Sequence, residues 1–222
     1  MRYFIVRGIV GCGKTAVAQL ITELVDGKRL STDNARLEIQ FDDSVKLGQA
    51  FRKDDAFQNQ QRFVYDLLLA LAERPTDEPG KVADELIEKS SYIKFSDGEQ
   101  KRLRMFITRR IREQRPAIIL DGTFSRPEQL RRFRDELPPK LAIVDVQASD
   151  AVIRTRLVNR VGESRAALNI YEAMLPAYKS AKDLGFHSHV INNDGTFEEL
   201  KKNVEKLINE VAACTFCHDR HG

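Results

Sequence analysis

Eight residues decide the fold: Gly8-Ile9-Val10-Gly11-Cys12-Gly13-Lys14-Thr15, which fit the spacing G-x-x-x-x-G-K-[ST]. A short apolar run, Tyr3–Val6, comes before them and predicts a strand, and the amphipathic pattern after them predicts a helix over Thr15–Val25. Glycines let backbone N–H groups turn inward around phosphate oxygens, and the start of a helix adds its positive dipole end. The stretch therefore predicts a phosphate-binding loop, and an ordinary glycine turn is the alternative.

Two further features extend this loop into a nucleotide and metal site. Lys14 is expected to reach the β- and γ-phosphates, and the Thr15 hydroxyl is expected to ligate Mg²⁺. The apolar run Ala117–Leu120 ends in Asp121, a carboxylate that would face the same Mg²⁺ from a neighbouring parallel strand; capping of the next helix is the alternative role. The nucleotide-binding residues predicted within the loop are Gly8, Gly11, Cys12, Gly13, Lys14 and Thr15.

The rest of the chain alternates short apolar runs with helical patterns. This alternation is typical of strands buried on both faces of a parallel sheet, and it predicts an α/β three-layer sandwich with a five-stranded, mainly parallel sheet. The predicted strands are Tyr3–Val6, Arg29–Ser31, Ala117–Leu120, Leu141–Val146 and His189–Ile191. The predicted helices outside residues 34–115 are Thr15–Val25, Arg126–Glu136, Asp150–Arg160, Leu168–Leu184 and Thr196–Ala212, the last with a capping box at Thr196 and Glu199.

The second predicted strand is followed by an acidic and a basic residue, Asp33 and Arg36. Asp33 would project above the carboxyl edge of the sheet, and Arg36 would share a face with it on a helical turn. A carboxylate in this position can accept the proton of an acceptor hydroxyl, and the arginine can hold anionic groups. The alternative is that Asp33 is the N-cap of a helix and Arg36 a surface residue.

The phosphate loop, Asp33-x-x-Arg36, residues 118–124 and the arginine-rich region near 154–165 resemble the small P-loop kinases. The resemblance is closer to the polynucleotide-kinase-like and zeta-toxin-like ATP-binding proteins, an AAA-type group. It implies ATP and Mg²⁺ as cofactors, Asp33 as the base and Arg36 as the residue that contacts the acceptor. It also implies a lid after the fourth strand, in which Arg156, Arg160 and Arg165 close over the phosphates, although each could equally belong to a solvated basic helix.

The resemblance also implies a domain organisation. Residues 1–222 are expected to form a single P-loop kinase domain with a lid over 161–167 and a tail over 213–222. Residues 34–115 show no convincing strand pattern and are expected to form a helical acceptor-binding insertion between strands two and three. The tail contains Cys214-Thr215-Phe216-Cys217-His218 and His221, a pattern compatible with metal, but a frayed end is the expected state.

Composition excludes several classes of protein. With 36 basic and 33 acidic side chains the net charge is +3, too low for a strongly basic protein that wraps nucleic acid. Residues 101–136 nevertheless carry 11 basic and 5 acidic side chains, a span that could attract a nucleic-acid end or a phosphorylated metabolite. No run is long enough to cross a membrane, the first residues read as a strand instead of a signal peptide, and three cysteines suggest a reducing cytoplasm.

These observations predict an ATP-dependent phosphotransferase that moves the γ-phosphoryl group to a hydroxyl. A polynucleotide 5′-hydroxyl or a nucleoside is the first expectation for the acceptor, based on Asp33, Arg36 and the basic span. A small-metabolite or amino-sugar acceptor is the second. An ATP-hydrolysing switch is the alternative from another class, although a switch has no need of an acceptor-holding arginine beside a base.

Overall fold

The computed structural model describes residues 2–41, 55–73, 78–138, 140–159 and 164–213. The chain forms two compact units, one made of Met1–Arg29 and Arg115–Gly222 and the other of Leu30–Gln114. The first contains most of the sheet and the phosphate loop, and the regular structure described in the second consists of helices and the last residues of one strand. No helix in the described ranges is long and apolar enough to cross a membrane.

The sheet has five strands in the order β2-β3-β1-β4-β5. β1 pairs in parallel with β3 and with β4, and β4 pairs in parallel with β5. All five predicted strands are confirmed, each longer than predicted by one or two residues. They are β1 (Arg2–Arg7), β2 (Gly27–Ser31), β3 (Ala117–Asp121), β4 (Leu141–Gln147) and β5 (His189–Asn192).

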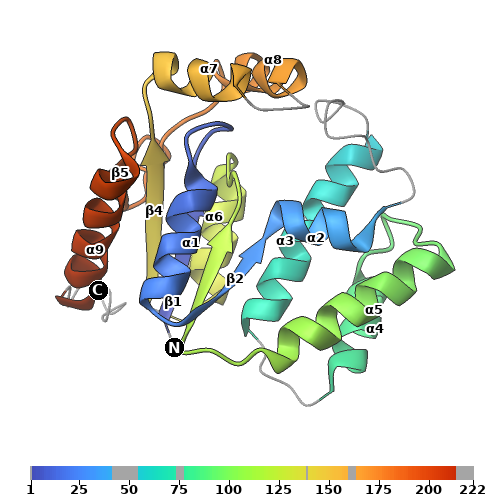
Figure 1. Cartoon of the computed structure of the whole chain (residues 1–222). Helices are drawn as coiled ribbons and strands as arrows, with labels where there is room; N and C mark the ends of the chain where they lie inside the picture. Colours follow the sequence, from blue (N-terminus) through green and yellow to red (C-terminus); the bar gives the residue numbers. More distant parts are fainter. Residues whose placement is uncertain (1, 42–54, 74–77, 139, 160–163, 214–222) are drawn as a thin grey trace. The chain divides into compact units, whose positions relative to one another are not determined.

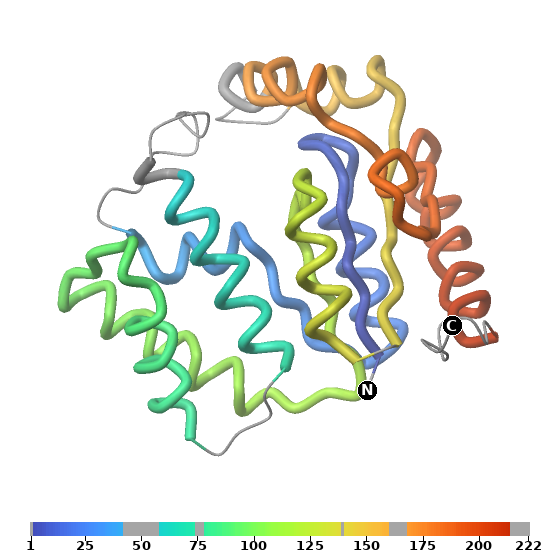
Figure 2. Tube along the Cα trace, turned by 180° about the vertical axis from the view of Figure 1, so that it is seen from behind, coloured from blue at the N-terminus to red at the C-terminus, as the bar shows by residue number. Residues whose placement is uncertain are grey.

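Helices cover both faces of this sheet, so the predicted three-layer α/β sandwich is confirmed. Figures 1 and 2, seen from opposite sides, show α1 (Lys14–Leu24) on one face and α6 (Pro127–Glu136) on the other. Phe4, Ile5 and Val6 of β1 are all fully buried. A strand that is covered on both faces has no exposed side, which explains why its residues are apolar throughout. On one face α9 (Phe197–Ala213) adds Val204 and Leu207 to the same core.

Two helices lie beyond the carboxyl ends of the strands, α7 (Asp150–Val158) and α8 (Ser164–Met174) (Figure 1). The predicted helix Leu168–Leu184 is wrong in its second half, because α8 ends at Met174. Pro176 follows at once and has no N–H to continue the helical hydrogen bonds. The chain then turns, with the Tyr178 N–H bonded to the Met174 carbonyl at 3.0 Å. The predicted helix Asp150–Arg160 ends earlier than expected, at Val158.

The second unit is built around an aromatic core. Phe63 is fully buried, and its ring centroid lies 6.1 Å from that of Phe41 and 4.8 Å from that of Phe95. Arg102 binds the C-terminal end of α2 (Thr32–Ile39), the first helix of this unit. It donates to the carbonyls of Ile39 and Gln40 at 2.5 and 2.6 Å. Within the described residues of 34–115 no strand occurs, as predicted. The helices of this unit are α2 (Thr32–Ile39), α3 (Asp55–Glu73), α4 (Pro79–Lys89) and α5 (Asp97–Arg112).

Candidate nucleotide site

The phosphate loop runs from the end of β1 to the start of α1, as the sequence predicts. Gly13 is the N-cap of α1 and has φ of +91°, a left-handed conformation that glycine adopts without a steric penalty. Among the described residues no side chain caps this helix, and its first turn contains no acidic residue. The first N–H groups of α1 are therefore left for an anion, whose charge the helix dipole favours.

The two predicted metal ligands meet beside this loop. The Thr15 hydroxyl donates to the Asp121 carboxylate across 3.5 Å, although the two residues come from α1 and β3. Asp121 is 2 % exposed and ends its strand, so it does not cap α6. A hydroxyl and a carboxylate are hard oxygen donors, which suit Mg²⁺ completed by water and phosphate oxygens. Across the described ranges no group of three or more His, Cys, Asp and Glu side chains could hold a metal without such a partner.

Arg29 belongs to this site and was missed by the sequence reasoning. From β2 its Nε and Nη2 atoms donate to the Asp121 Oδ2 atom at 3.1 and 2.6 Å. The carboxylate that would face Mg²⁺ therefore has a guanidinium against it. The sequence did contain one indication of this role, an arginine within a predicted strand. A charged side chain in a buried strand usually has a charged partner.

Cys12 contributes packing to the loop in addition to its backbone. Its side chain is fully buried, and a Cβ atom added to Gly8 would lie 2.3 Å from the sulfur. Burial raises the pKa of the Cys12 thiol, against the lowering effect of Lys14. A neutral, enclosed thiol is a poor nucleophile, so the residue fits a structural role.

Arg156 reaches the same loop from α7. Its Nη2 atom donates to the Asn193 carbonyl at 2.8 Å, and its Nη1 atom is buried with no hydrogen-bond partner in the described part of the chain. The Asn193 side chain in turn donates to the Cys12 carbonyl at 2.9 Å. Asn193 is a second residue that sequence reasoning did not assign to the loop. Its only signal was its place directly after the last strand.

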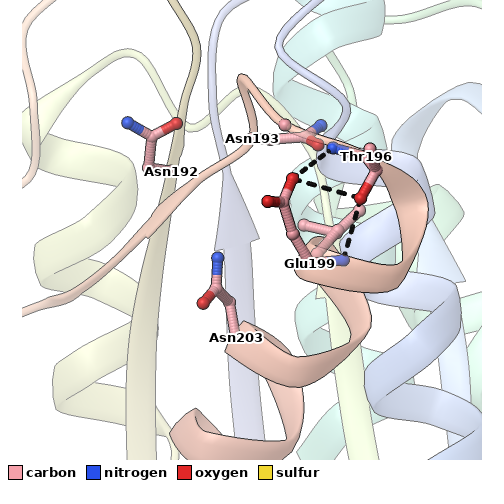
Figure 3. A pocket seen from close by; sticks show the side chains of 7 residues that line it. Asn192, Asn193, Thr196, Glu199 and Asn203 are labelled. Carbon is pink, nitrogen blue, oxygen red and sulfur yellow. Dashed lines mark hydrogen bonds between the residues drawn. The ribbon is translucent and has the colours of Figure 1, made fainter.

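A pocket of about 340 Å³ lies beside this asparagine, where β5 leads into α9 (Figure 3). The predicted capping box closes one side of it: the Thr196 N–H donates to the Glu199 carboxylate at 2.7 Å, and the Glu199 N–H donates to the Thr196 hydroxyl at 3.3 Å. The residues that line the pocket are Asn192, Asn193, Gly195, Thr196, Glu199, Leu200 and Asn203.

Asp33 and Arg36 lie in α2, in the helical unit. Their side chains pair at 3.4 Å, and Asp33 is 66 % exposed. The N-cap of α2 is Ser31, whose hydroxyl accepts from the Asn34 N–H at 3.5 Å. The alternative that Asp33 is the helix cap is therefore wrong, whereas its role as a base stays a prediction.

The predicted lid is described only in part. Arg160 and residues 161–163 lie outside the described ranges, and residues 164–167, with Arg165, form the first turn of α8. Cys214, Cys217, His218 and His221 of the tail also lie outside them. The neighbouring Arg154 pairs with Asp150 and with Glu172 and so joins α7 to α8.

Comparison with known proteins gives a family match and a solved structure of the same fold. A family model described as an AAA domain matches residues 4–183. None of the curated proteins matches the chain. A sugar kinase from Janibacter sp. HTCC2649 has the same fold, with a TM-score of 0.52 and 16% identity over 94% of this chain and 95% of that one.

Two other solved structures are more distant. A gluconokinase from Sinorhizobium meliloti 1021 has a TM-score of 0.48 and 13% identity, over 95% of both chains. A shikimate kinase from Acinetobacter baumannii has a TM-score of 0.47 and 12% identity, over 96% of this chain and 94% of that one.

Proposed function

This chain belongs to the AAA domain family, and from that premise we propose that it is an ATP-dependent kinase whose acceptor is the hydroxyl of a small metabolite. One observation carries the proposal: the Thr15 hydroxyl and the buried Asp121 carboxylate meet at 3.5 Å beside a loop whose helix has no side-chain cap among the described residues. Such a pair is suited to a metal ion that bridges phosphate oxygens.

The residues would share the chemistry as follows. The loop amides and Lys14 would bind the β- and γ-phosphates, and Thr15 and Asp121 would hold Mg²⁺. When bound, the ion would supply positive charge beside the phosphates. Arg156, with Arg160 and Arg165 of the predicted lid, would stabilise negative charge on the transferring group. Asp33 would accept the proton of the acceptor hydroxyl while Arg36 holds the acceptor.

Charge pairing argues for a small acceptor and against a nucleic-acid end. The basic span 101–136 is the feature that favours a polynucleotide, yet several of its arginines have acidic partners. Arg104 pairs with Asp84, Arg115 pairs with Asp26, and both Arg109 and Arg110 pair with Glu38. Paired arginines present less net charge to a phosphate backbone. The sugar kinase with the same fold supports the small-metabolite proposal by analogy.

An acceptor screen with γ-labelled ATP tests this proposal. We expect label to move to sugars, sugar acids or other small polyols, and Lys14→Ala to abolish the transfer while the fold is retained, because Lys14 lies at an accessible loop–helix junction. Label on 5′-hydroxyl oligonucleotides would contradict a small-metabolite acceptor. It would show instead that the acceptor is a polynucleotide, as the resemblance to the polynucleotide-kinase-like proteins implies. Label found only in free phosphate would support the nucleotide-hydrolysing switch instead.

A further inference from the structure

We propose that Asn193 is a positioning residue of the phosphate loop, which holds the Cys12–Gly13 peptide so that the Gly13 N–H faces the nucleotide phosphates. The inference rests on the proposed nucleotide site and adds to it a residue from the other end of the chain. Asn193 follows β5 and precedes α9 (Figure 3), 181 residues away from the loop that it contacts.

Asn193 is held through both its backbone and its side chain. Its backbone N–H donates to the Gln147 carbonyl of β4 at 2.8 Å, and its side-chain Nδ2 atom donates to the Cys12 carbonyl at 2.9 Å. Asn193 is only 6% exposed. A Cβ atom on Gly13 would lie 2.0 Å from Nδ2, so the amide packs directly on the loop and excludes any side chain at that position.

Because of the geometry of the peptide bond, this contact fixes the orientation of the Gly13 N–H. A trans peptide is planar, so the Cys12 carbonyl and the Gly13 N–H point in opposite directions. An amide that binds the carbonyl on one side therefore presents the N–H to the other side. Gly13 is free to adopt other conformations. Without the bond from Asn193, the peptide could rotate and point its carbonyl oxygen at the phosphates, which would repel them.

Arg156 provides independent evidence that an anion binds beside the phosphate loop. One end of its guanidinium is bound to the Asn193 carbonyl, and its Nη1 atom lies 3.7 Å from the position of a Cβ on Gly13. That atom is buried and has no partner in the described ranges. A buried N–H donor without a partner is costly unless a ligand satisfies it. Asn193 thus connects the loop to α7, the helix that precedes the predicted lid.

The test measures binding of Mg²⁺-tripolyphosphate and of Mg²⁺-ATP by calorimetry, well below the melting temperature of each variant. We expect Asn193→Ala to weaken both ligands by a similar factor of roughly ten or more, the effect of one lost buried hydrogen bond. Asn193→Asp keeps the size but replaces the donor with a carboxylate that faces the Cys12 carbonyl, and it should weaken both further. Asn192→Ala is the matched control, because among the described residues that exposed side chain bonds its neighbour Asp194, whose N–H it accepts from, and not the phosphate loop.

Several outcomes would overturn the inference. Normal affinity for both ligands in a folded Asn193→Ala or Asn193→Asp variant would show that the loop does not need the bond. A loss confined to ATP would assign Asn193 to the nucleoside, and a lower melting temperature with unchanged affinity would make it purely structural. If the unaltered chain binds neither ligand, the proposed function itself fails, which is a separate result.

Discussion

At the scale of the residue, the two carboxylates singled out by the sequence have opposite surroundings. Asp121 is almost fully buried, and it accepts from a guanidinium and a hydroxyl. Asp33 is largely exposed on the first turn of α2. A buried acceptor with fixed partners suits metal binding, whereas an exposed carboxylate is accessible to a substrate. The predictions for the two residues therefore differ.

Asp33→Asn should lower kcat by about 10²- to 10⁴-fold with nearly unchanged affinity for ATP, because it removes a proton acceptor and little volume. The free energy of unfolding of Asp33→Asn and of Asp33→Ala should stay within about 0.5 kcal/mol of that of the parent chain, because Ser31 and not Asp33 is the helix cap. Steady-state kinetics in the presence of the acceptor, with thermal melts of both variants, provide the measurement. Near-normal phosphoryl transfer by Asp33→Asn would mean that the base is another residue.

Arg29→Met should reveal the metal site through stability. Removing the guanidinium leaves the Asp121 charge buried beside fewer donors, and we expect a loss of about 1–3 kcal/mol in the free energy of unfolding without metal. Mg²⁺-ADP should then raise the melting temperature of Arg29→Met more than that of the parent chain, because the cation replaces the lost charge.

The matched control for this prediction is Arg115→Met, whose partner Asp26 is 72% exposed. Pairs of this kind contribute about 0–1 kcal/mol, so the control should show the parental response to Mg²⁺-ADP. Equal shifts for Arg29→Met and the parent chain would argue against Asp121 as a metal ligand.

At the scale of the element, β1 and β4 are joined by a buried ion pair next to the phosphate loop. Arg7 and Asp145 are 0% and 1% exposed and lie 3.2 Å apart. Both also bind the segment after α8: Arg7 donates to the Lys179 carbonyl at 2.7 Å, and Asp145 accepts from the Ala181 N–H at 2.5 Å. The turn that replaces the second half of the predicted helix is therefore held by the sheet.

This pair predicts strong coupling in a double-mutant cycle. Arg7→Met and Asp145→Leu should each cost about 3–5 kcal/mol, because each leaves the other charge buried and uncompensated. The double variant should be clearly more stable than the sum of the two losses predicts, since no unpaired charge remains. Urea denaturation of the four proteins measures the coupling. Additive losses would show that the two side chains act independently.

At the scale of the whole molecule, the nucleotide residues and the candidate base belong to different compact units. Gly8–Thr15 and Asp121 lie in the unit that contains most of the sheet, and Asp33 and Arg36 lie in Leu30–Gln114. The second unit has its own core around Phe63. Nucleotide binding and acceptor handling should therefore respond separately to core mutations.

Phe63→Ala should destabilise the helical unit by about 3–5 kcal/mol, with faster hydrogen exchange in α3 and α5 and a lower kcat, while affinity for ATP stays within about two-fold. Phe133→Ala is the matched control: this ring is 1% exposed and packs on Phe124 in the sheet unit. It should produce the opposite pattern, with faster exchange in β3 and α6. Equal loss of protection across both units after Phe63→Ala would mean that they unfold together.

Much of this molecule could be predicted from local sequence. The phosphate loop, all five strands and the capping box at Thr196 depend on neighbours within a few residues, so spacing and periodicity reveal them. The end of α8 at Met174 was also local: Pro176 marks it, and the apolar pattern that continues past it was misleading. The meeting of Thr15 with Asp121 followed from parallel strands, whose carboxyl ends share one edge of the sheet.

Only the tertiary structure decided which distant side chains complete the site. Arg29 reaches Asp121 across 92 residues, Arg7 reaches Asp145 across 138, and Asn193 reaches Cys12 across 181. None of these pairs has a local signature, because an arginine in a strand or an asparagine in a loop has many possible partners. Strand order and register choose the partner, and burial then favours the contact strongly, since a buried polar group left without a partner is costly.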